Sequence, residues 1–82
     1  MSEDRQEWDA YVARVCAALG LDPGLVPIDE VLDLTRVIAH GGMRPMAPVS
    51  AYILALAAAG RPDADVVELR RTLEEAADLP RA

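Results

Sequence analysis

The residue types best suited to chemistry gather in one short segment, residues 39–48. It holds the chain's single histidine, two adjacent glycines and two of its three methionines. Arg36 and His40 lie one helical turn apart, and Arg44 follows four residues later. If the three face one point at the start of the next helix, they form a small cationic cleft, because backbone N–H groups there favour anions. Arg36, His40 and Arg44 are therefore candidate ligands for a small anion such as a phosphate or a carboxylate.

The same segment also has a purely structural interpretation, as a tight corner between two helices. Glycines permit positive φ angles, prolines stiffen a loop, and methionines fill the space beneath it. His40 would then cap the last carbonyls of the helix that precedes the corner. Isolated loop residues of these types usually serve turns, so the corner is the favoured interpretation and the anion site the alternative.

Metal binding is not expected. Zinc sites need three or four closely spaced Cys, His or carboxylate ligands. Asp29, Asp33 and His40 share one predicted helix, but there is no second histidine, and Cys16 is the only cysteine. We therefore expect neither a metal nor any other cofactor, and a lone cysteine excludes an internal disulfide.

Catalysis is not expected either. A nucleophile needs an oriented base, and Cys16 falls on an apolar helix stripe where a buried, inert thiol is typical. Ser50, in the first turn of a predicted helix, is better placed to bond nearby backbone. No strand precedes a glycine-rich phosphate loop. The sequence predicts a protein that is not an enzyme.

Apolar residues recur at helical spacing throughout the chain, which predicts an all-α fold. We expect one domain over residues 1–82, a compact bundle of four helices joined by short loops that contain Pro and Gly. Gly20 should end the first helix, Asp22 should cap a single turn, and Asp63 should cap the last helix. Trp8 should be core, and Arg70 should face solvent on the last helix. The four helices are predicted over residues 3–19, 28–40, 48–59 and 64–78.

Composition excludes several classes of protein. The chain has 82 residues and a formal net charge of -6, the wrong sign for a protein that neutralises phosphates or an anionic membrane. The longest uncharged run, residues 45–60, is too short to cross a bilayer and contains a proline. The N-terminal residues are acidic and no apolar signal core follows, so a cytoplasmic protein is expected. The absence of Lys, Asn and Phe is typical of GC-rich coding and indicates a bacterial source.

The predicted third helix is apolar on every side, which is the pattern of a buried helix. Three other helices of so small a chain can hardly enclose it. Part of its surface is therefore expected to meet a second copy or another protein. Tyr52 and Leu56 on this helix, with Tyr11 on the first, are the candidate interface residues, since an exposed Tyr beside an apolar patch marks contact surfaces.

Several stretches together resemble a known family. They are residues 31–41, the Arg44-Pro45 and Ala47-Pro48 pairs, the apolar helix that ends at Gly60, and Trp8 together with residues 18–21. The most specific part is Ala-His-Gly-x-x-Arg-Pro-x-Ala-Pro at residues 39–48. The pattern resembles a small uncharacterised bacterial helical domain, found free or as a C-terminal extension of molybdopterin-guanine dinucleotide biosynthesis protein A-like proteins.

The resemblance implies a role in molybdenum-cofactor biosynthesis but supplies no catalytic residues. The expected function is a non-catalytic accessory module that binds a guanylyltransferase-like protein of this pathway, itself, or both. The alternative is a protein that binds a small anion, or a nucleotide or pterin phosphate, through Arg36, His40 and Arg44.

Overall fold

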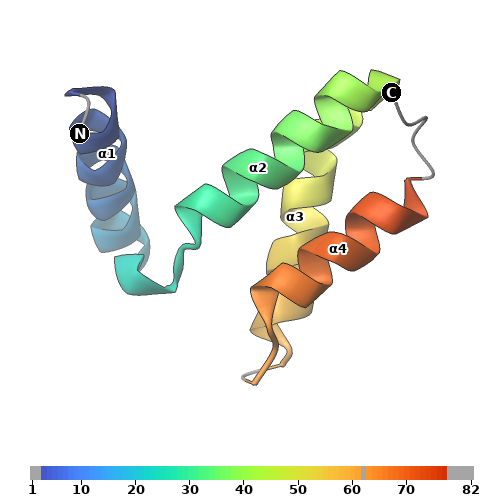
Figure 1. Cartoon of the computed structure of the whole chain (residues 1–82). Coiled ribbons are helices and arrows are strands. Elements are labelled where there is room, and N and C mark those ends of the chain that lie inside the picture. Colours follow the sequence, from blue (N-terminus) through green and yellow to red (C-terminus); the bar gives the residue numbers. More distant parts are fainter. Residues whose placement is uncertain (1–2, 62, 78–82) are drawn as a thin grey trace.

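The computed structural model describes residues 3–61 and 63–77, and these residues form helices and turns without a strand (Figure 1). The predicted all-α helical bundle is confirmed. The α-helices are α1 (Glu3–Leu19), α2 (Ile28–Ile38), α3 (Met46–Ala59) and α4 (Val66–Ala76). Two short helical turns, η1 (Pro23–Leu25) and η2 (Ala39–Met43), precede α2 and α3 respectively.

The first helix ends where the sequence predicted. Gly20 has a φ of 71°, a left-handed conformation that costs glycine nothing. Its N–H donates to the carbonyl of Ala17, and the N–H of Leu21 donates to the carbonyl of Cys16. This pair of bonds is the Schellman arrangement, which satisfies carbonyls left open by the helix end. Asp22 then caps η1 by accepting from the N–H of Gly24, also as predicted.

The corner between α2 and α3 is formed by η2, in which Gly42 has a φ of 100°. The helical path thus runs beyond His40 before it breaks. Helix α3 begins at Met46, two residues before the predicted start at Pro48. A proline fits in the first turn because those N–H groups have no partner within the helix.

The last helix begins two residues later than predicted. Asp65, not Asp63, is its N-cap, and the side chain of Asp65 accepts from the N–H of Val67 at 2.9 Å. The carbonyl of Arg61 accepts from the N–H of Ala64 at 2.9 Å, so Asp63 lies within a turn. The helix is described to Ala76, and residue 78 of the predicted range lies outside the described residues.

The buried core lies between α2, α3 and α4, which pack against one another (Figure 1). Four buried residues form its centre: Leu34, Ile38, Ala47 and Leu54. Partly buried apolar side chains surround them from α2, η2, α4 and the residue after α4: Val31, Ala39, Val66, Leu69, Leu73 and Ala77. Ala76, the last residue of α4, is exposed.

An ionic cluster joins α4 to α2 beside this core. Arg70 Nη1 lies 3.0 Å from Glu30 Oε1 and 3.5 Å from Asp33 Oδ2, and Arg70 Nε lies 3.1 Å from Glu74 Oε2. The Nε–Oε2 pair is close but lacks the alignment of a hydrogen bond. The sequence prediction that Arg70 faces solvent is therefore wrong, because α2 passes alongside this face of α4.

Helix α1 stands to one side of the other three (Figure 1). Among the described elements, its backbone comes close only to η1. Its links to α2 are made by side chains, including an ion pair between Arg5 and Asp29. Trp8 remains 47% exposed, so the prediction that it is core is wrong, whereas the predicted burial of Cys16 is confirmed.

No helix within residues 3–61 and 63–77 has both the length and the apolar character needed to cross a bilayer.

Candidate functional site

The most distinctive surface of the molecule is one side of α3. Four large apolar side chains recur there at steps of three and four residues, and all four are exposed: Val49, Tyr52, Ile53 and Leu56. We call this set the α3 outer face. Tyr52 is 67% exposed and Leu56 is 60% exposed. No charged residue occurs anywhere in α3, so nothing on this helix offsets the apolar character of the outer face.

The opposite side of the same helix is buried. Ala47, Ser50 and Leu54 face α2 and α4, and Leu54 is only 2% exposed. Both sides are apolar, yet only one has neighbours. Helices α2 and α4 cover one side of α3, and no described helix packs on the α3 outer face.

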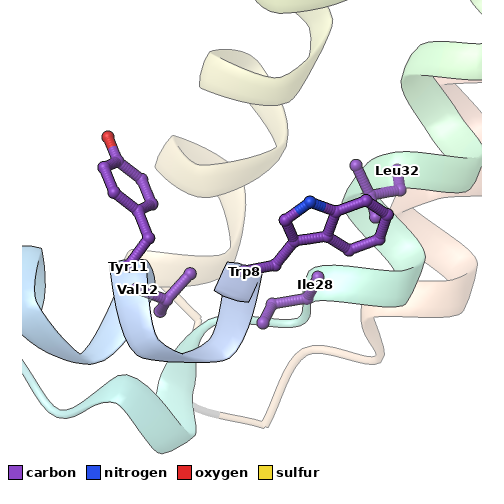
Figure 2. A pocket seen from close by; sticks show the side chains of 5 residues that line it. All are labelled: Trp8, Tyr11, Val12, Ile28 and Leu32. Atoms are coloured by element: carbon purple, nitrogen blue, oxygen red, sulfur yellow. The ribbon is translucent and has the colours of Figure 1, made fainter. Parts of the chain in front are cut away.

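A second apolar surface lies between α1 and α2. Five side chains line a groove of about 260 Å³, which we call the α1–α2 groove: Trp8, Tyr11, Val12, Ile28 and Leu32. Figure 2 shows the indole of Trp8 reaching from α1 toward Ile28 and Leu32, while the ring of Tyr11 points away from α2. The groove is the gap left by a helix that is docked through side chains alone.

One electrostatic feature fixes α1 at this groove. The guanidinium of Arg5 donates to the carboxylate of Asp29 on α2 and also to Asp9 on α1, the latter at 3.2 Å. The hydrogen bond to Asp29 is the largest cause that raises the pKa of Arg5 above its usual value. Arg5 is charged at every ordinary pH in any case.

The predicted interface residues fall on two surfaces. Tyr52 and Leu56 lie one turn apart on the α3 outer face, whereas Tyr11 lines the α1–α2 groove. All three side chains are exposed. Their role in binding remains a prediction. Sequence reasoning missed Val49 and Ile53, although their spacing from Tyr52 and Leu56 was a signal that could have found them.

The predicted anion ligands are exposed and spread along the corner. Arg36 Nη2 lies 3.4 Å from Asp33 Oδ1, so its charge is already partly balanced. His40 lies in η2, and Arg44 follows the break at Gly42. Among the described residues, no hydrogen bond or ion pair draws the three together. An anion site at this corner stays a prediction.

The other candidate catalytic residues lie on separate helical elements. Cys16 is buried near the end of α1 and His40 is exposed on η2, and these two elements are not in contact. Ser50 is buried in the α3 side that faces the core. The part of the chain that the structure describes holds no group of three or more His, Cys, Asp or Glu side chains placed to bind a metal ion.

Comparison with known proteins assigns the chain to a family without assigning a function. The model of the family described as "Domain of unknown function (DUF6457)" matches residues 3–82, so the chain belongs to that family. No curated protein and no solved structure matches the chain.

Proposed function

We propose that this member of the DUF6457 family is a non-catalytic helical interaction module, and that the α3 outer face is its principal binding surface. The observation that carries the proposal is the exposure of four large apolar side chains on an uncharged helix. Monomeric proteins rarely expose contiguous apolar surface of this kind unless it binds something.

The energetics support a contact surface of ordinary strength. Complete burial of a Val, Leu or Ile side chain contributes about 1.5–3 kcal/mol, and the α3 outer face has roughly half of that gain still available at each position. Tyr52 lies at the centre of the set and is the residue type most often found among binding hot spots, with Trp and Arg. Truncation of Tyr52 should therefore cost more binding energy than truncation of Val49.

The proposed partner is a molybdenum-cofactor guanylyltransferase-like protein. Support for this partner comes from the resemblance of residues 39–48 and the flanking stretches to a domain found free or as a C-terminal extension of such proteins. The proposed setting, the cytoplasm of a bacterium, rests on the sequence in the same way. The α3 outer face would then dock on an apolar patch of the larger protein.

The experiment is co-purification of the tagged chain with the guanylyltransferase-like protein of the same genome. We expect a complex that Leu56→Glu abolishes, because the substitution places an unpaired carboxylate in an apolar contact. Arg71→Ala is the matched control, since Arg71 is exposed on α4 and pairs with Glu68 at 3.1 Å. A complex that tolerates Leu56→Glu would reject the α3 outer face, and the absence of any complex would reject this partner.

A further inference from the structure

We propose that α1 and η1 form a hinged arm that turns about Val26 and Pro27, and that the Arg5–Asp29 ion pair holds this arm closed on α2. The inference makes no use of the α3 outer face, so it is independent of the proposed function. Three observations support it: the division of the elements into two packed bodies, the backbone of the hinge, and the charges of the two helices that the ion pair joins.

The first observation is that the described elements divide into two packed bodies. The backbone of η1 comes close to α1, whereas α2, η2, α3 and α4 come close to one another, and no element of the first group comes close to one of the second. The N–H of Leu21 donates to the carbonyl of Cys16, which holds the start of the connector on α1. We therefore expect α1 and η1 to move together.

The second observation is the hinge between the two bodies. Val26 and Pro27 connect η1 to α2, with ψ angles of 108° and 77°. The N–H of Ile28 donates to the carbonyl of Val26 at 3.0 Å, which closes an inverse γ-turn around Pro27. Proline fixes φ but leaves ψ free, and hinges are usually a few residues at the ends of elements. Rotation here moves the arm and leaves the packing within each body intact.

The third observation is the charge of the two helices. Helix α1 contains four carboxylates and two arginines, and α2 contains three carboxylates and one arginine, so each helix has a net charge of -2. Two such helices repel each other unless a cation lies between them. Arg5 supplies this cation, since its guanidinium donates to Asp29 on α2 and its side chain is only 30% exposed. Loss of the pair therefore removes an attraction and leaves the repulsion.

Opening of the arm changes which apolar side chains are exposed. In the closed position the indole of Trp8 lies toward Ile28 and Leu32 on α2 (Figure 2). When α1 turns away, these two side chains of α2 lose that cover, and so does Val12 on α1. The arm thus controls access to a second apolar surface, which is separate from the α3 outer face.

The test is amide hydrogen exchange of the full chain, measured residue by residue by NMR. Arg5→Glu sets two carboxylates against each other and should accelerate exchange along α1 about three- to tenfold, because an undocked helix is only marginally stable. Asp29→Arg in the same chain restores an ion pair with the charges reversed and should return most of the protection. Residue 29 is not on α1, so this rescue separates the contact between helices from the Arg5–Asp9 pair within α1.

Arg14→Glu is the matched control, since Arg14 is exposed on α1 and the substitution makes the same change of charge. It should leave exchange along α1 within a factor of about two of the unmodified chain. An Arg5→Glu chain that Asp29→Arg does not rescue overturns the role of the ion pair. Equal acceleration in all four helices overturns the hinged arm, because rotation about Val26 and Pro27 leaves α2, α3 and α4 packed.

Discussion

Helix α1 and the unit formed by α2, α3 and α4 are built from similar helices but differ in how they are held. The three-helix unit has its own buried centre, in which Leu34, Ile38 and Leu54 are almost fully excluded from solvent. Helix α1 is the longest of the four, yet its Trp8 stays about half exposed. Its side-chain links to α2 are the Arg5–Asp29 ion pair and the walls of the α1–α2 groove.

The difference shows that an apolar stripe does not determine its own burial. What determines it is how many neighbouring helices pack against that stripe, and residues 3–61 and 63–77 form one cluster of buried residues, between α2, α3 and α4. We therefore expect the three-helix unit to carry most of the stability and α1 to open first, as parts of a protein with few buried contacts do.

The largest expected effect is at Leu54. Leu54→Ala should lower the free energy of unfolding by about 2–5 kcal/mol, because it leaves a cavity in the only buried centre among the described residues. Denaturant titration followed by circular dichroism measures this loss. Leu56→Ala, two residues away on the α3 outer face, should cost less than about 0.5 kcal/mol when the chain is dilute enough to be monomeric. Equal losses at the two positions would mean that the two sides of α3 are buried alike.

A smaller effect is expected where α4 docks on α2. Arg70→Ala should cost about 1–3 kcal/mol, since it leaves the carboxylates of Glu30 and Glu74, both about a quarter exposed, without their cation. Arg71→Ala, next to it but exposed, should cost less than about 0.5 kcal/mol. Thermal unfolding of both variants provides the comparison, and an Arg70→Ala variant as stable as Arg71→Ala would show the cluster to be inert.

The smallest effect on global stability is expected in α1. Trp8→Ala should accelerate amide hydrogen exchange along α1, because a helix of 17 residues is only marginally stable when undocked. The slowest amides of α2 and α3 should change by less than about 0.5 kcal/mol. Exchange measured residue by residue by NMR separates the two regions. Uniform acceleration in all four helices would show that they unfold as one unit and would remove the distinction drawn above.

Local rules predicted much of the fold. The ends of α1, the positive φ of Gly20 and the Asp22 cap depend on adjacent residues, and the sequence was sufficient for them. Asp63 was mistaken for the cap of α4 because Asp63 and Asp65 both precede an apolar run, and only the turn closed by Arg61 and Ala64 separates them.

Those local rules do not predict contacts between residues that are far apart in the sequence. Arg70 and Glu74 are four residues apart, which is the spacing of an ion pair on a solvent-exposed helix face. No feature of the neighbouring sequence predicts that Arg70 also bonds to Glu30, 40 residues earlier. Trp8 has the spacing of a core residue, but its burial depends on where the connector between α1 and α2 directs the helix. The candidate surface was predictable in part, since the all-round apolar character of α3 required exposure of one side, while the sequence did not specify which.

The single thiol of the chain lies at the joint between these two regions. Cys16 is 4% exposed, and its carbonyl accepts the hydrogen bond that closes the end of α1. A thiol reagent can reach its sulfur only after this end of α1 opens. The rate at which Cys16 is labelled therefore measures how often this end of α1 opens, in a protein that needs no foreign probe.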